Sequence, residues 1–126
     1  YDFVLCDRSL VDNFIYAEEA YEKEQQELPS WVEPFVLHNS KSYNFLFKTV
    51  ISPQGLIQDG VRSTDSDWQK LVDMKLKYYL KENDIAHTEL PLSDAEDTHD
   101  MIAYATRQAK FMANKIVDMD VQTRIL

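Results

Sequence analysis

The sequence predicts an α/β domain in which a parallel sheet carries helices on both faces. Short apolar segments that are typical of strands alternate along the chain with longer segments of helical periodicity. Residues 3–6 form a continuous apolar run, as in a strand that is buried on both faces of a parallel sheet. The length of 126 residues, with 44% hydrophobic and 28% charged residues, suits one globular domain. We therefore expect residues 1–126 to form a single α/β domain.

Three segments have the pattern of strands. The first is residues 3–6, and the second, residues 43–51, is rich in aromatic and β-branched side chains and is followed by a loop that contains both glycines. The third is residues 85–90, which Pro91 follows. A helical pattern lies between each strand and the next, which is the connection that parallel strands require.

The first helix is expected to begin at Ser9, whose hydroxyl can cap it, and to end before Pro29 and Pro34. One face carries its apolar residues: Leu10, Phe14, Ala17 and Tyr21. The other face carries the acidic residues and is expected to be solvated: Asp12, Glu18, Glu19, Glu22 and Glu24.

Three further helices are predicted. A short one covers about residues 31–39, and a longer one is opened by residues 63–67 and ends at residues 83–84. The apolar positions of the longer helix are Trp68, Leu71, Val72, Leu76, Tyr79 and Leu80. The last helix runs from Thr98 to about Val117 on the apolar face made by Ile102, Ala105, Ala109, Met112 and Ile116. The sequence of residues 118–126 predicts neither a helix nor a strand.

Charge and cysteine content exclude several classes of function. The 13 Lys and Arg residues against 22 Asp and Glu give a net charge of -9, which disfavours non-specific binding to duplex nucleic acid. No apolar run approaches the ~18 residues of a membrane-spanning helix. Cys6 is the single cysteine, so the chain forms neither an internal disulfide nor a cysteine-based zinc site. We expect a cytoplasmic protein in which Cys6 is a small buried hydrophobe.

The first candidate for chemistry is Asp7, which follows the apolar run directly. Open α/β sheets bind ligands at the carboxyl ends of their strands, and Mg²⁺ bound to phosphates takes one or two carboxylates and keeps several waters. An Asp here suits a nucleotide site. The alternative is that Asp7 caps the next helix and that Arg8 is solvated.

The second candidate is the segment 59–65, Asp-Gly-Val-Arg-Ser-Thr-Asp, which precedes the longer helix. Gly60 permits unusual backbone angles, the helix start offers free N–H groups, and the Arg62 guanidinium suits bidentate phosphate contact. The alternative is a turn in which Thr64 is the cap and Arg62 pairs with a surface acid. Gly55 and Gly60 have the spacing of a Walker A loop, but Val-Arg follows where Lys-Ser or Lys-Thr is required.

The histidines do not have the spacing of a metal site. His38, His87 and His99 are widely separated, and each is expected to be an ordinary polar residue.

Together these motifs resemble a known family. The apolar run that ends in Asp-Arg-Ser, the acidic helix, the aromatic strand and the segment 59–65 are similar to the second part of P-loop nucleoside- and nucleotide-kinase-like AAA-type ATPases. The resemblance covers about residues 2–90. It implies a three-layer P-loop NTPase-like parallel sheet that is incomplete at its N-terminal side, because the Walker A segment is absent from this sequence. It also leads us to expect ~60 further residues upstream, enough for a βαβ unit and a strand.

The resemblance implies a role for each matching residue. Asp7 is directed toward Mg²⁺ or the acceptor hydroxyl, and Arg8 and Arg62 toward phosphates. The cofactor-binding residues are expected to be Ser9, Asp59, Gly60, Ser63 and Thr64. The implied activity is an ATP- and Mg²⁺-dependent phosphotransferase or ATPase that acts on a nucleoside, nucleotide or similar small metabolite.

The alternative function is a non-catalytic or partner-completed interaction domain without its own triphosphate-binding loop. It would dock through the acidic helix or form a homo-oligomer through the apolar face of the last helix. Both functions stay open at the level of the sequence.

Overall fold

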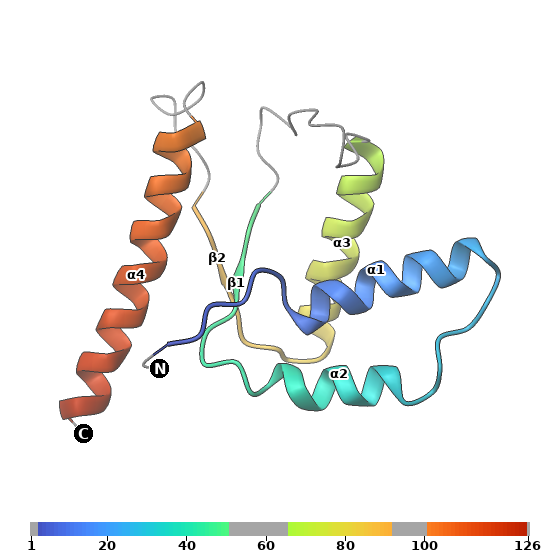
Figure 1. Ribbon diagram of the computed structural model, residues 1–126, viewed down its shortest axis with the longest axis horizontal. Helices are drawn as coiled ribbons and strands as arrows, with labels where there is room; N and C mark the ends of the chain where they lie inside the picture. The colour runs from blue at the N-terminus through green and yellow to red at the C-terminus, as the bar shows by residue number, and fades with distance from the viewer. Residues whose placement is uncertain (1–2, 51–65, 92–100, 126) are drawn as a thin grey trace. The chain divides into compact units, whose positions relative to one another are not determined.

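A computed structural model of the chain describes residues 3–50, 66–91 and 101–125 (Figure 1). The chain forms two compact units, one from Tyr1–Leu46 and Lys70–Ala86 and the other from Phe47–Gln69 and His87–Leu126. The elements in chain order are the helices α1 (Leu10–Lys23) and α2 (Val32–Ser40), the strand β1 (Phe47–Lys48), the helix α3 (Ser66–Glu82), the strand β2 (Thr88–Glu89) and the helix α4 (Met101–Ile125). The expectation of a single domain over residues 1–126 stays a prediction.

Helix α1 begins where the sequence predicts, but it buries a different face. Its buried apolar residues are Val11, Phe14 and Ile15, whereas the predicted face also contained Ala17 and Tyr21, which are only partly buried. Glu19, expected on the solvated face, is buried as well. Apolar residues lie on both sides of this helix, so the sequence pattern alone does not determine which side packs inward.

Helices α2 and α3 confirm their predictions. Helix α2 packs against α1 and buries Val36, while α3 buries Tyr79 and Leu80. The end of α3 shows why residues 83–84 stop it. Asp84 has a positive φ of 51°, and the Ile85 amide donates back to the Leu80 carbonyl at 2.9 Å, as in a left-handed helix C-terminus.

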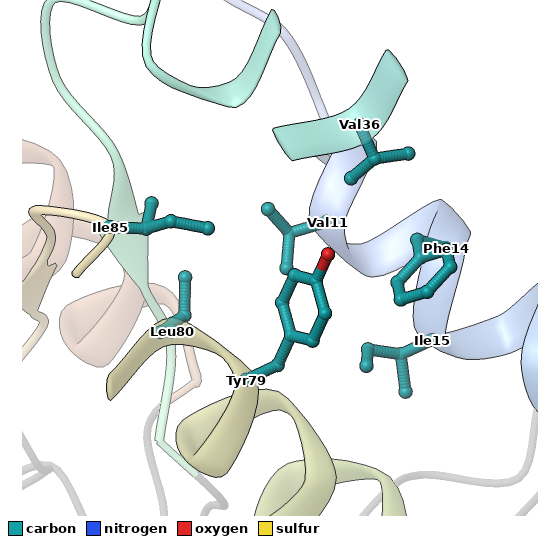
Figure 2. Packing of buried hydrophobic residues seen from close by; sticks show 7 residues of the cluster. All are labelled: Val11, Phe14, Ile15, Val36, Tyr79, Leu80 and Ile85. Atoms are coloured by element: carbon teal, nitrogen blue, oxygen red, sulfur yellow. The ribbon is translucent and has the colours of Figure 1, made fainter. Parts of the chain in front are cut away.

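The core of the first unit joins three helices and the segment that follows α3 (Figure 2). Its buried side chains are Val11, Phe14, Ile15, Val36, Tyr79, Leu80 and Ile85. The rings of Phe14 and Tyr79 lie 5.0 Å apart at an interplanar angle of 46°, a tilted arrangement that aromatic pairs favour. The hydrophobic packing of this unit therefore depends on contacts between α1 and a helix that begins more than forty positions later in the chain.

The second unit contains the sheet, which is far smaller than predicted. β1 and β2 pair in parallel, with Phe47 opposite Thr88 and Lys48 opposite Glu89, and the Leu90 amide donates to the Lys48 carbonyl at 2.8 Å. The parallel direction agrees with the predicted strand–helix–strand connection. Among the described residues, the predicted strands 43–51 and 85–90 each contain two paired residues.

The predicted three-layer parallel sheet with helices on both faces is wrong for the described residues. They contain four helices and one two-stranded sheet. The apolar run 3–6, taken as a buried strand, belongs to no strand, and Phe3, Val4 and Leu5 are 67%, 81% and 85% exposed. A short apolar run has the same pattern whether or not a strand pairs with it, and among the described residues no strand pairs with this one.

Helix α4 confirms the last predicted helix and continues eight residues beyond its predicted end at Val117. The predicted apolar face is not fully buried: Ile102 is 81% exposed, and Ala105 and Ala109 are exposed too. None of the helices in the described residues is long and apolar enough to cross a membrane.

Candidate functional site

The first candidate site is the turn Asp7-Arg8-Ser9 that enters α1. Asp7 and Arg8 are exposed, and Asp7 does not follow a strand, which corrects the placement expected from the apolar run. Cys6 is exposed as well, as a free thiol, and not the buried hydrophobe that was predicted. Both corrections have the same cause, because the segment 3–6 lies outside the sheet.

Ser9 fixes the start of α1 through a capping box. The Ser9 hydroxyl donates to Asp12 Oδ2 at 2.7 Å and accepts from the Asp12 amide at 3.3 Å, and the Ser9 amide donates to the same carboxylate oxygen at 2.8 Å. Ser9 is therefore the cap, as predicted, and the alternative in which Asp7 caps the helix is wrong. Its hydroxyl, expected to contact the cofactor, serves the helix start.

A tyrosine from outside α1 also holds this turn. The Leu10 amide, one of the free N–H groups of the first helical turn, donates to the Tyr43 hydroxyl at 3.1 Å. Tyr43 comes from the segment after α2, so the entry to α1 is anchored from a position 33 residues away. The sequence contains no signal for this contact, because a lone tyrosine at a predicted strand start has many possible partners.

Arg8 has an unusual backbone and a defined side-chain contact. Its φ is 75°, in the left-handed region that glycine favours and that costs energy for a residue with a β-carbon. Its guanidinium carbon lies 5.1 Å from the centre of the Tyr16 ring, within the range of a cation–π interaction. The turn thus presents a cation whose backbone and side chain are both restrained.

The second candidate site lies outside the described residues. That segment contains Arg62 and four of the residues expected to bind the cofactor: Asp59, Gly60, Ser63 and Thr64. The assignment of these residues stays a prediction.

A third cluster of charged residues, which the sequence did not predict, joins α1 and α3. The Lys75 ammonium donates a hydrogen bond to the carboxylate of buried Glu19, and its Nζ lies 3.5 Å from Glu22 Oε2. The hydrogen bond from Lys75 to Glu19 raises the pKa of the Lys75 ammonium above its ordinary value. An open groove of about 410 Å³ adjoins this ion pair, and its lining includes Glu18, Tyr21, Glu22, Leu28 and Lys75.

Negative charge accumulates around this cluster. Burial raises the pKa of the Glu18 carboxyl, and the nearby Glu33 adds to the effect. Burial, with Glu33 and Glu18 nearby, also raises the pKa of the Tyr79 phenol to about 12. These shifts have a structural explanation in packing and like charge. The three carboxylates that line the groove, Glu18, Glu22 and Glu27, repel a phosphate.

No metal centre is formed by the parts of the chain that the structure describes, since no three His, Cys, Asp or Glu side chains gather there in a group that could hold an ion. His38 and His87 are exposed, and His99 lies outside the described residues. A Mg²⁺ ion that is carried by phosphates needs only one or two protein carboxylates, and exposed Asp7 fits that smaller requirement.

Comparisons with protein-family models, with curated proteins and with solved structures gave no match.

Proposed function

We propose that this chain forms part of the nucleotide site of an ATP- and Mg²⁺-dependent phosphotransferase or ATPase that acts on a nucleoside, nucleotide or similar small metabolite. The observation that supports the proposal is the parallel pairing of β1 and β2 on either side of α3 in the chain. In a parallel strand–helix–strand unit, the segment that joins the first strand to the helix leaves the carboxyl end of the strand, where such units bind ligands. In this chain that connection is the one that contains Arg62.

The motif resemblance supplies the activity, and the residues suit it chemically. Arg62 and Arg8 are planar cations that can donate two hydrogen bonds to one phosphate. Asp7 supplies the carboxylate that a phosphate-bound Mg²⁺ requires. Phosphoryl transfer depends on positioning and on charge stabilisation, so an acid and two arginines, with the metal bound, are a suitable set.

The test is equilibrium binding of Mg-ATP to the intact polypeptide by calorimetry, followed by turnover measurements. We expect Asp7→Asn and Arg62→Ala to abolish turnover. Lys81→Ala, which removes an exposed cation from the last turn of α3, is the control and should keep the activity of the parent. Turnover that survives in both site variants would remove the assignment, and a polypeptide that does not bind Mg-ATP would remove the proposed function.

A second candidate function is self-association through α4. Ile102, Val117 and Met119 of this helix are 81%, 58% and 49% exposed. The helix carries four basic residues against two acidic ones in a chain of net charge -9, whereas α1 carries four acidic residues against one basic. This complementarity favours a second copy of the chain as the partner, with α4 of one copy on α1 of the other.

Sedimentation equilibrium distinguishes this second candidate. Ala105→Glu on the exposed apolar face should shift an oligomer toward monomer, while Asn44→Glu, which makes the same charge change at an exposed position after α2, should leave the oligomer in place. An unchanged mass in the α4 variant, or a monomeric parent, would exclude self-association through this face.

A further inference from the structure

We propose that Tyr16 is a positioning residue that holds the Arg8 guanidinium ready for a nucleotide phosphate. The inference rests on the proposed function, because that function gives Arg8 its phosphate. The sequence assigned no role to Tyr16, which lies eight positions after Arg8.

The contact between the two side chains has the geometry of a cation–π interaction. The Arg8 guanidinium carbon lies 5.1 Å from the centre of the Tyr16 ring, and the limit for a significant interaction is about 6 Å. Tyr16 lies on α1 and is partly buried, whereas Arg8 is exposed. A ring on a packed helix therefore holds a side chain that would otherwise move freely in water.

The backbone at Arg8 is restrained in a second way. Its φ of 75° places it in a region that non-glycine residues seldom occupy and that persists only where neighbouring contacts enforce it. Those contacts are present on its C-terminal side: the Ser9–Asp12 capping box and the hydrogen bond from the Leu10 amide to the Tyr43 hydroxyl. The backbone conformation sets the direction of the Arg8 side chain, and the contact with Tyr16 sets the position of its guanidinium.

This arrangement agrees with the chemistry of phosphate recognition. A guanidinium interacts with an aromatic ring through its flat face and with a phosphate through the N–H groups along its edge, so both interactions can occur together. Restraining the side chain before binding lowers the conformational entropy that is lost when the phosphate is bound. Tyr16 thus acts on binding without contacting the nucleotide.

The experiment compares aromatic and aliphatic replacements at Tyr16 by calorimetric titration of the intact polypeptide with Mg-ATP. Tyr16→Phe and Tyr16→Trp keep a ring and should bind as the parent does. Tyr16→Leu should bind about two- to five-fold more weakly, the factor that corresponds to the loss of a cation–π contact at an exposed site. Tyr21→Leu, on the same helix and also partly buried, is the matched control and should have no effect.

Two further measurements separate positioning from folding. The Arg8 side-chain protons should show an NMR shift from the aromatic ring in the parent and in Tyr16→Trp, and this shift should be absent in Tyr16→Leu. Arg8→Ala combined with Tyr16→Leu should bind no more weakly than Arg8→Ala alone, because Tyr16 acts only through Arg8.

The outcomes distinguish the inference from the function on which it rests. Weaker binding in Arg8→Ala together with parent-like binding in Tyr16→Leu would overturn the role of Tyr16 and leave the proposed function standing. Additive losses in the double variant would also overturn it. Parent-like binding in Arg8→Ala, or no binding by the parent, would remove the role of Arg8 in the proposed function and the inference with it.

Discussion

At the residue scale, Ser9 shows how one side chain defines the entrance to the candidate site. The first turn of a helix leaves several backbone N–H groups without partners, and the Ser9 hydroxyl satisfies one of them while Asp12 returns a bond to the Ser9 amide. The capping box begins at the residue directly after Arg8, whose backbone is in the left-handed region.

Replacing Ser9 should therefore destabilise the protein. Ser9→Ala removes the capping hydroxyl and should lower the free energy of unfolding by about 1 kcal/mol, as for other lost N-caps. Urea denaturation followed by circular dichroism measures this change. Ser30→Ala, at an exposed serine between α1 and α2, is the control, and an equal loss in both variants would contradict the capping role.

Tyr79 gives a second prediction at this scale. Its hydroxyl is buried and has no hydrogen-bond partner among the described residues. Tyr79→Phe removes an unpartnered polar atom from the core and should raise the free energy of unfolding at pH 7 by ~1 kcal/mol. Tyr78→Phe, at the adjacent exposed tyrosine, should change it little.

The same variant should change the response to alkali. Burial raises the pKa of Tyr79 from 10.0 to about 12, so between these values the unfolded chain loses a proton that the folded chain keeps. The free energy of unfolding therefore falls as the pH rises from 10 to 12. It should fall less in Tyr79→Phe than in the parent. Equal losses in Tyr79→Phe and the parent, measured by urea denaturation at each pH, would contradict this assignment.

At the element scale, α1 and α3 are joined by an ion pair as well as by the core. Glu19 is buried and Lys75 is its partner from a position 56 residues further along the chain. A buried carboxylate is costly unless it is paired, so the Lys75 ammonium offsets the cost of burying Glu19.

Replacing one partner of this ion pair should lower the free energy of unfolding more than replacing both partners. Lys75→Met leaves the Glu19 carboxylate buried without its cation and should lower the free energy of unfolding by about 1 kcal/mol, a low value because the Lys75 side chain is 35% exposed. Adding Glu19→Gln should recover part of that loss. Lys70→Met, at an exposed position of α3, is the control for lysine loss, and strictly additive effects of the Glu19 and Lys75 changes would contradict the coupling.

The elements also show which predictions succeeded for local reasons. The start of α1 and the end of α3 were predictable because a capping box and a left-handed stop act within a few residues of the helix ends. Helix α1 ends at Lys23, earlier than the predicted stop before Pro29, and α2 begins at Val32 without a side-chain cap. The lengths of β1 and β2 were not predictable in this way. A strand exists only where another strand pairs with it, and the partner is a distant part of the chain.

At the scale of the whole molecule, the excess of acidic residues is the main feature. With a net charge of -9 on 126 residues, the acidic side chains repel one another in the compact state. The acidic residues around the groove on α1 are one local expression of this excess, and partial burial together with the nearby Glu33 raises the pKa of the Glu18 carboxyl there.

Salt should therefore stabilise the protein. Raising the ionic strength from about 0.01 M to about 0.15 M shortens the Debye length from ~30 Å to ~8 Å and screens the repulsion between distant carboxylates. We expect a higher thermal midpoint at the higher ionic strength, measured by circular dichroism at pH 7. An uncharged solute at the same osmolarity is the control, and a midpoint that falls with salt would show that attractive ion pairs outweigh the repulsion.

The sequence by itself determined the features that depend on near neighbours or on totals. These are the Ser9 cap, the stop at residues 83–84, the four helices, the parallel direction of β1 and β2, and the net charge. Only the tertiary structure decided that residues 3–5 are exposed, that Glu19 is buried and that Tyr16 lies against Arg8. The physical reason is that a residue is buried or paired only by contact with another part of the chain. For Glu19 that part is Lys75, 56 residues further along, and the sequence around Glu19 does not indicate it.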